Sequence, residues 1–246
     1  MVPVALMYYE RNPIGLSTVD LPILTGLSIT QIFLPNLLQN IGLEYTTASV
    51  SSVLQSTTPV FTLLLSLALL NERIGGRELV GLCVGMVGVL LLSTQGNFAN
   101  LGGSTFFGNV LQVAVAASYA VSGIIGKVVL RKYRPILVVA LTFLLGALIL
   151  TGCALLFERD VWPSAISREV IVAMLLLSLL YCLGLVSWYD VLQRTGVFQL
   201  YVLLFTMPVL AIIISVIVLE ETFTFNDILF SAMTLVGVAI TQTGKR

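Results

Sequence analysis

Long apolar runs alternate with short polar links along the whole chain. Each run is about as long as a helix that crosses a bilayer, roughly 20 residues, and the links hold most of the charged residues. The pattern predicts eight transmembrane helices, near residues 22–43, 46–70, 77–94, 105–127, 136–157, 170–190, 196–219 and 226–243. The expected fold class is therefore all-α, a polytopic membrane helix bundle.

The second run, residues 46–70, is polar along one half of its helical surface. On a helical wheel that half collects Ser51, Ser52, Gln55, Ser56, Thr58, Pro59, Thr62 and Ser66. Polar groups in hydrocarbon must be paired, so this half is expected to face other helices or a cavity rather than lipid. We interpret it as a cavity wall.

Composition excludes several classes of protein. The chain has 246 residues, of which 58% are hydrophobic and 10% charged, with no histidine, and this is too apolar for a soluble domain. A membrane enzyme would need His, Asp, Glu or Cys gathered at one face, and a nucleic-acid binder would need a basic patch; the sequence suggests neither. Cys83, Cys153 and Cys182 lie in apolar runs and are expected to pack. No metal and no cofactor are expected.

The basic residues predict an orientation. If residues 1–21 are cytoplasmic, that side collects ten of the 12 lysines and arginines. The link KVVLRKYRP at residues 127–135 is the clearest anchor. With eight spans both termini would be cytoplasmic, and the expected location is the cell membrane.

An internal repeat relates two parts of the chain. An offset of 149 residues places 43–92 on 192–241 without a gap. The matched positions include Thr46 on Thr195, Pro59 on Pro208, Glu72 on Glu221 and Gly88 on Gly237. An odd number of spans separates the copies, so they would have opposite orientations in the membrane, an inverted repeat.

At these residues the chain resembles a known family. The segment GLEYTTASVSSVLQSTTPVFTLLLSLALLNERIGGRELVGLCVGMVGVLLL is similar to the second half of an EamA repeat of the drug/metabolite transporter superfamily, and residues 192–243 are similar to its second copy. The sequence departs from the family where a Gly usually precedes the acidic residue, at Asn71 and Glu220. The resemblance implies a transporter with ten spans, five per repeat.

Only three predicted spans precede the second repeat. The domains expected are therefore a first repeat at 1–94, incomplete at its N-terminus, and a second repeat of five spans at 104–243. Either the chain starts late, which we favour, or the protein functions with eight spans.

Two prolines mark the predicted substrate site. Pro59 and Pro208 each remove a backbone donor near the middle of a span, and interrupted helices at matching places in two repeats indicate a transport site. They would free the carbonyls of Gln55 and Leu204. The candidate cavity residues are Gln31, Ser52, Gln55, Ser56, Thr58, Pro59, Gln112, Tyr119, Tyr181, Tyr201, Phe205 and Pro208. The alternative is that prolines and hydroxyls here serve helix packing alone.

Two further features are interpreted as structural. Gly81, Gly85 and Gly88 have the spacing that lets helix backbones approach closely. Glu72 and the neighbouring arginines would form a solvated cluster in a loop.

The leading hypothesis is a secondary transporter or exporter of a small amino-acid-like or drug-like metabolite, working by alternating access of two inverted repeats. No predicted span has a carboxylate at its middle, so either the coupling residue lies in the missing segment or, as we favour, transport is facilitated or an exchange. A membrane scaffold or sensor, or an inactive truncated fragment, remains as an alternative. The expected partners are the solute and the lipid bilayer, not nucleic acid; a homodimer is left open.

Overall fold

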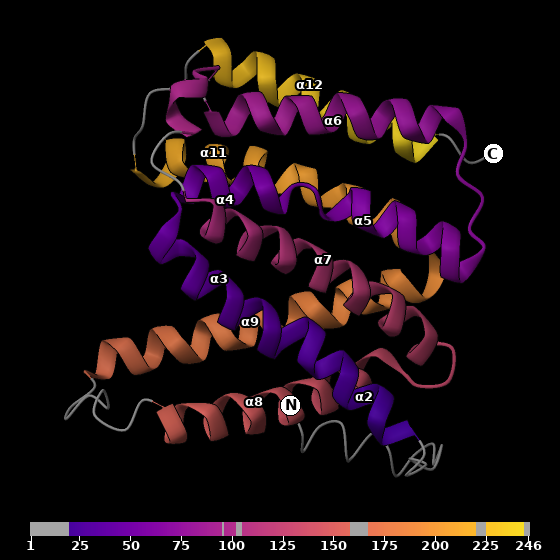
Figure 1. The fold of residues 1–246 in the computed structure, drawn as a ribbon, viewed down its shortest axis with the longest axis vertical. Helices are drawn as coiled ribbons and strands as arrows, with labels where there is room; N and C mark the ends of the chain where they lie inside the picture. The colour runs from indigo at the N-terminus through magenta and orange to yellow at the C-terminus, as the bar shows by residue number, and fades with distance from the viewer. Residues whose placement is uncertain (1–19, 95, 102–104, 158–166, 220–224, 244–246) are drawn as a thin grey trace. The chain divides into compact units, whose positions relative to one another are not determined.

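The computed structural model describes residues 20–94, 96–101, 105–157, 167–219 and 225–243. Every regular element in these ranges is helical (Figure 1). The α-helices are α2 (Leu21–Ser28), α3 (Leu34–Tyr45), α4 (Ala48–Gln55), α5 (Thr58–Leu65), α6 (Gly76–Thr94), α7 (Phe106–Val129), α8 (Pro135–Phe157), α9 (Arg168–Arg194), α10 (Val197–Val202), α11 (Thr206–Leu219) and α12 (Phe225–Thr243). Wider π-helical turns η2 (Ile29–Phe33) and η3 (Ser66–Leu70) and tighter 3₁₀ turns η4 (Phe98–Leu101) and η5 (Leu203–Phe205) complete the described part.

The helices follow the eight predicted runs, and the all-α class is confirmed. Six helical segments are long and apolar enough to cross a membrane: Leu21–Tyr45, Val50–Leu70, Gly76–Thr94, Phe106–Val129, Pro135–Leu156 and Arg168–Arg194. Two further apolar helices, Val197–Leu210 and Ile228–Thr243, are shorter. The chain is a multi-pass membrane protein. The interpretations of residues 1–19 and of Glu220 and Glu221 fall outside the described residues.

Two helical segments are interrupted next to a proline of the sequence repeat. The first breaks between α4 and α5, at Ser56 and Thr57, and Pro59 lies in the first turn after the break. The second narrows to the 3₁₀ turn η5 shortly before Pro208. Adding the repeat offset of 149 to position 56 gives 205, the last residue of η5, so the two interruptions fall at matching places in the sequence copies.

The chain divides into two compact units. Unit 1 comprises residues 1–34 and 125–194, and unit 2 comprises residues 35–124 and 195–246. Each unit therefore contains segments from both predicted repeats. The units do not coincide with the repeats 1–94 and 104–243, which stay a prediction, and each unit is described by itself.

Unit 1 is organised around α8, which contacts α2, η2 and α9. Its fully buried side chains include Leu27, Leu130 and Leu192. Gly146 of α8 lies against Ile32, and a Cβ there would come within 2.9 Å of the Ile32 side chain. The absence of a side chain thus lets α8 approach η2 closely.

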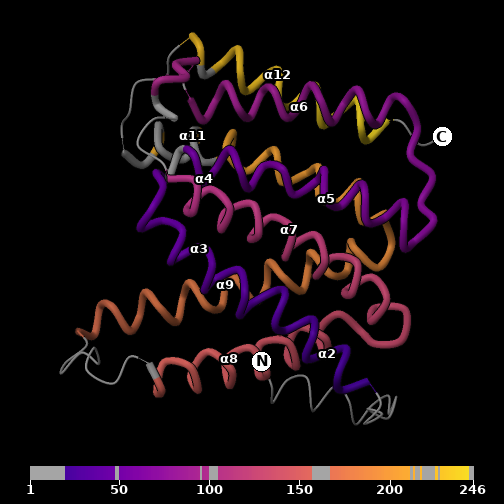
Figure 2. Tube along the Cα trace, viewed as in Figure 1, coloured from indigo at the N-terminus to yellow at the C-terminus, as the bar shows by residue number. Residues whose placement is uncertain are grey.

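Unit 2 contains a tightly packed pair, α6 and α12, which run side by side (Figure 2). Gly81 lies against Thr241, and Gly88, seven residues later on α6, lies against Thr234, seven residues earlier on α12. The two helices are therefore antiparallel. The interpretation of these glycines as packing residues is confirmed.

The closest approach in this pair joins two glycines. A Cβ on Gly237 would lie 2.2 Å from the backbone nitrogen of Gly85. Beside this crossing Phe205 packs on Gly85, within the apolar core of unit 2. That core comprises Leu63, Leu82, Val89, Phe198, Val202, Phe205 and Val238.

Candidate functional site

The most connected polar group in unit 2 is formed by side chains of α4 and α7, and we call it the amide cluster. Ser51 and Gln55 lie one turn apart on α4, so they share a face, and both reach Gln112 of α7. The Ser51 hydroxyl donates to Gln112 Oε1 at 2.9 Å, and Gln55 Nε2 donates to the same oxygen at 3.0 Å. Gln55 Nε2 also donates to Ser51 Oγ at 3.0 Å.

Gln112 is the centre of the amide cluster. Its side chain is 0% exposed, and its Nε2 donates to the main-chain carbonyl of Gln39 on α3 at 3.3 Å. A Cβ at Gly42 would lie 2.5 Å from that nitrogen, so a glycine on α3 makes room for the amide. The structure thus brings together Gln55 and Gln112 from the predicted set. Ser51 belonged to the polar half of its span, whereas the Gln39 carbonyl was not predicted as a partner.

Three consecutive hydroxyls rearrange the hydrogen bonds of the helix before Pro59. Ser56, Thr57 and Thr58 each donate, at 2.6 Å, to the main-chain carbonyl three residues earlier. For Thr58 that carbonyl belongs to Gln55, the one that loses its helical donor to Pro59. The prediction that the Gln55 carbonyl is free is therefore wrong, because the hydroxyl replaces the missing N–H.

Ser52 is separate from the amide cluster. It is exposed, and its hydroxyl lies 3.3 Å from that of Ser93 on α6. Among the predicted residues of this span, Thr58 and Pro59 are buried, whereas Gln55 and Ser56 are half-buried. Gln55 and Ser56, at the break, are therefore polar residues whose side chains are only partly covered.

Tyr201 of α10 and Tyr119 of α7 are also brought together. The Tyr201 hydroxyl donates to the main-chain carbonyl of Tyr119 at 2.9 Å. Its ring covers Gly123, where a Cβ would lie 2.7 Å from the ring. Tyr201 is buried by this packing, and Tyr119 is half-buried.

Phe205 and Pro208 surround the second interruption. Phe205 is buried in the core of unit 2, and Pro208 is half-buried. The Thr206 hydroxyl donates to the carbonyl of Leu203 at 2.7 Å, as the hydroxyls near Pro59 do. The geometry gives Phe205 a packing contact with α6.

In unit 1 the structure joins two other predicted residues. Gln31 lies in the π-helical turn η2 and is buried, and its side chain hydrogen-bonds to Tyr181 of α9, which is 51% exposed. The Tyr181 ring packs edge-on against Phe143 of α8, with centroids 5.6 Å apart and an interplanar angle of 76°. The π turn was not predicted. Its signal in the sequence is Pro35, which removes the helical donor for the Gln31 carbonyl.

Two acidic residues of unit 2 have roles that the sequence did not indicate. Glu72 Oε1 accepts from the backbone N–H of Val197 at 2.9 Å and so caps the first turn of α10, where Gly196 has no side chain to do so. Describing Glu72 as part of a solvated loop cluster was therefore wrong. Glu78 is 2% exposed, and its Oε1 accepts from Gln199 Nε2 at 3.3 Å.

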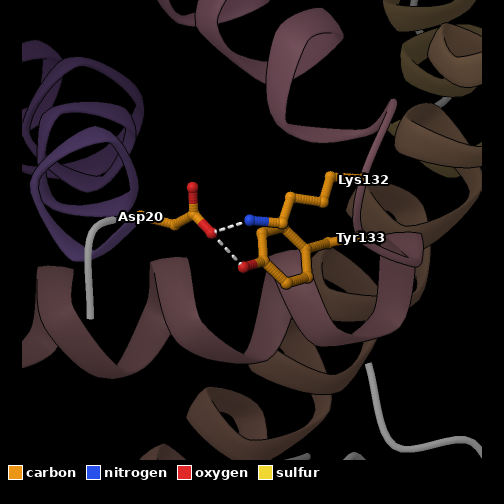
Figure 3. Close-up of polar contacts among 3 residues, drawn as sticks. All are labelled: Asp20, Lys132 and Tyr133. Carbon is orange, nitrogen blue, oxygen red and sulfur yellow. Dashed lines mark hydrogen bonds and ion pairs between the residues drawn. The ribbon is translucent and has the colours of Figure 1, made fainter. Parts of the chain in front are cut away.

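The basic link between α7 and α8 is tied to the start of α2 within unit 1. Lys132 and Tyr133 both donate to one carboxylate oxygen of Asp20 (Figure 3). Two hydrogen bonds lower the pKa of Asp20 below its ordinary value, and the one from Lys132 has a larger effect than the one from Tyr133. The same bond to Asp20 raises the pKa of Lys132.

The end of α9 is bound by the last turn of α7, residues 125–129, which also belongs to unit 1. Lys127 Nζ donates to the main-chain carbonyls of Leu192 and Gln193 at 2.7 and 3.1 Å. Gln193 Nε2 in return donates to the Leu130 carbonyl at 2.7 Å. A lysine at the end of a helix stabilises the partial negative charge of its last carbonyls.

The described residues contain no group of three His, Cys, Asp or Glu side chains that could hold a metal ion. The chemistry that the site residues offer is therefore hydrogen bonding by amides, hydroxyls and carbonyls. Such groups can donate and accept hydrogen bonds with a polar solute.

Comparison with known proteins gives consistent results. The profile of the EamA-like transporter family matches residues 1–94 and 106–243. A protein of Archaeoglobus fulgidus named an uncharacterized transporter is 28% identical over 90% of this chain and 77% of its own length. The uncharacterized transporter YetK of Bacillus subtilis is 26% identical over 98% of this chain and 74% of its own. One crystal structure superposes with a TM-score of 0.77 over 99% of this chain and 84% of the other, and at 19% identity this shows a shared fold.

Proposed function

The chain belongs to the EamA-like transporter family, and we propose that it is a secondary transporter that carries a small amino-acid-like or drug-like metabolite by alternating access. Its relatives are named as transporters, not as enzymes. Membership of the family implies a small-molecule solute and a membrane environment. The solute class and the mechanism are the parts proposed here.

The observation that carries the proposal is the pair of interrupted helices. The breaks at Ser56–Thr57 and at η5 are at matching positions of the two sequence copies, and α10 packs against α5 in unit 2. Interrupted membrane helices expose backbone and side-chain polar groups at depths where lipid cannot pair them, and transporters use such positions to bind solutes. Of the predicted site residues, Ser56 and Phe205 lie within these breaks, and Gln55 and Thr58 flank the first break.

Flux in proteoliposomes tests transport. Purified protein would be reconstituted and loaded with members of a panel of amino acids, amines and aromatic drugs, and exchange of labelled solute would be followed. We expect saturable flux of at least one panel member. Folded protein that moves no member of the panel would refute the proposal and favour a scaffold or sensor.

A double variant tests whether α4 takes part. Gln55→Leu with Ser56→Ala removes polar atoms at the first break and should lower flux at least tenfold while leaving the helical content unchanged. Ser187→Ala on α9 is the matched control, because among the described residues that exposed hydroxyl bonds only to the carbonyl of Leu183 in its own helix, at 3.0 Å. Equal flux in all three proteins would remove α4 from the pathway.

We also propose that both termini are cytoplasmic, in the cell membrane. The support is the excess of lysine and arginine on one side of the predicted topology, ten against two. Accessibility of single cysteines placed in the link at 131–134 to an impermeant thiol reagent checks this orientation. Labelling of intact cells from outside at these positions would contradict it.

A further inference from the structure

The basic link between α7 and α8 is a folded turn, with some side chains in the interior of unit 1 and others at its surface. The backbone N–H groups of Leu130, Lys132 and Tyr133 donate to carbonyls in the last turn of α7, at 2.8 to 3.0 Å. Leu130 and Tyr133 are buried and anchor the turn. Arg131, Lys132 and Arg134 are exposed. The fold therefore holds three cations at the surface of unit 1.

Hydrogen bonds within unit 1 bring a fourth exposed cation, Arg194 at the end of α9, to this link. Gln193 Nε2 donates to the Leu130 carbonyl at 2.7 Å, and Lys127 Nζ donates to the Gln193 carbonyl at 3.1 Å. Arg194 directly follows Gln193, and Arg131 directly follows Leu130, so the two arginines lie at the same end of unit 1. We define the basic patch as the four exposed cations gathered here: Arg131, Lys132, Arg134 and Arg194.

Two carboxylates in the described part of unit 1 pair with members of the basic patch. Asp20 binds Lys132 (Figure 3). Asp190 pairs with Arg194 at 2.9 Å, but the side chains are 45% and 73% exposed, and pairs so open to water are weak. Arg131 has no side-chain partner among the residues that the structure describes. Four cations against two carboxylates leave the patch with a net positive charge.

Exposed apolar side chains lie next to the patch on the same two helices. Val128 is in the last turn of α7 and Val191 is in the last turn of α9, and both are exposed. Each precedes an arginine of the patch by three residues, which is about one helical turn. The surface of unit 1 thus changes from apolar to cationic over about 5 Å. In a bilayer such a boundary lies where acyl chains give way to headgroups.

This combination of surfaces selects an amphiphilic anion. A phosphodiester carries one negative charge and accepts two parallel hydrogen bonds from the planar fork of a guanidinium group. A zwitterionic headgroup adds a cation of its own, which the net charge of the patch would repel. Free phosphate would match the arginines but leave Val128 and Val191 without a partner.

From this arrangement we propose that the basic patch of unit 1 binds the headgroup of an anionic phospholipid, whose acyl chains lie against Val128 and Val191. The inference goes beyond the proposed transport function, since it concerns a lipid partner and not the solute. Basic links also set the orientation of a membrane protein during insertion. That role requires the charges but no bound lipid, so lipid binding separates the two explanations.

Native mass spectrometry of the full chain, released from detergent micelles, measures this binding. The probes are phosphatidylglycerol and phosphatidylcholine with identical acyl chains, titrated separately. A lysine or arginine near an anionic membrane surface raises affinity by about fivefold. We expect phosphatidylglycerol to bind at least about tenfold more tightly than phosphatidylcholine. A large molar excess of inorganic phosphate should not displace it.

Three variants locate the binding. Arg131→Gln with Arg194→Gln removes two charges of the patch and should lower the preference for phosphatidylglycerol by about tenfold or more. Both side chains are exposed, so the melting temperature should not change. Arg168→Gln is the matched control, because Arg168 is an exposed arginine at the other end of α9. Asp190→Asn acts in the opposite direction: it releases Arg194 from its ion pair and should strengthen phosphatidylglycerol binding.

Four results would overturn the proposal: equal binding of the two lipids by the folded wild type, displacement of phosphatidylglycerol by inorganic phosphate, an unchanged lipid preference in the double variant, or an equal loss of preference in Arg168→Gln. Flux in proteoliposomes is a separate result. A chain that binds phosphatidylglycerol with these variant effects but moves no solute would support the lipid site and contradict the transporter proposal.

Discussion

Replacing Gln112 by leucine should destabilise unit 2. Leucine has a similar volume, so the change removes hydrogen bonds without opening a large cavity. Three bonds are lost, to the Gln39 carbonyl, to Ser51 and to Gln55. The Gln55 amide loses the partner that fixes its orientation.

The magnitude follows from those three bonds. A hydrogen bond between membrane helices contributes about 0.6 kcal/mol on average, so three contribute about 2 kcal/mol. The Ser51 hydroxyl and one Gln55 N–H would also be left without their acceptor, and an unsatisfied buried donor costs about 1–3 kcal/mol. Ser51 is buried and Gln55 only half-buried, so we count this cost once and expect a loss of about 3–5 kcal/mol in the free energy of unfolding. Such a loss lowers the ratio of folded to unfolded protein by roughly 100-fold or more.

Unfolding by titration with sodium dodecyl sulfate in mixed micelles, followed by circular dichroism, measures this loss. Gln193→Leu is the control, because that glutamine is exposed and its side chain makes one hydrogen bond within the described part of the chain, of 2.7 Å to the Leu130 carbonyl. We expect the control to lose well under 1 kcal/mol. If Gln112→Leu unfolds at the same fraction of sodium dodecyl sulfate as the control, the amide cluster does not stabilise unit 2.

Three further predictions concern the surroundings of the site. Gly237→Ala should lower the free energy of unfolding by about 1–3 kcal/mol, because its Cβ would lie 2.2 Å from the α6 backbone. Gly184→Ala is the control, since a Cβ there has nothing within 4 Å, and equal melting temperatures of the two variants would contradict the helix crossing. Glu72→Gln keeps an acceptor for the start of α10 but loses its charge, so amide hydrogen exchange there should speed up by a few-fold; unchanged exchange would mean that the cap contributes nothing. Because the pKa of Asp20 is lowered in the folded protein, this carboxyl adds stability at pH values above its ordinary pKa of 3.8, and the gain is lost as the pH falls through the folded pKa. Because the pKa of Lys132 is raised, this amine adds stability at pH values below its ordinary pKa of 10.5, and the gain is lost as the pH rises through the folded pKa. Asp20→Asn should therefore flatten the pH dependence of the melting temperature at both ends, and a variant with the wild-type profile would exclude this pair as its source.

The helices were predictable because the bilayer imposes one rule on them. A span must be about 20 apolar residues long, and this rule alone placed all eight runs to within a few residues of the observed helices. The glycine positions were predictable for a related reason, since only small residues let membrane helices touch. The spacing of Gly81, Gly85 and Gly88 indicated a close helix contact, and Gly85 makes one; its partner Gly237 was not predicted.

The site was predictable only in part. Periodicity placed Gln55 and Gln112 on inward faces, and the structure brings them together, but it could not indicate that Gln112 uses its amide nitrogen on the Gln39 carbonyl. Nor could it indicate that Thr58 satisfies the carbonyl freed by Pro59. Both depend on local geometry of about 1 Å, whereas a sequence pattern gives only the face of a helix.

At both breaks a hydroxyl donates to the main-chain carbonyl three residues earlier, but the surroundings of the two breaks differ, and this difference bears on the mechanism. At the α4–α5 break, the hydroxyls of Ser56 and Thr57 donate to main-chain carbonyls, and both residues are half-buried. At the matching break, Phe205 and its neighbours fill the space in the apolar core of unit 2, and Tyr201 gives its hydroxyl hydrogen to α7. Two repeats that exchanged conformations during alternating access would exchange backbone shapes but not side chains. The polar contact with a solute would therefore stay with α4 in both states, and the second break would act as the apolar surface against which the helices move.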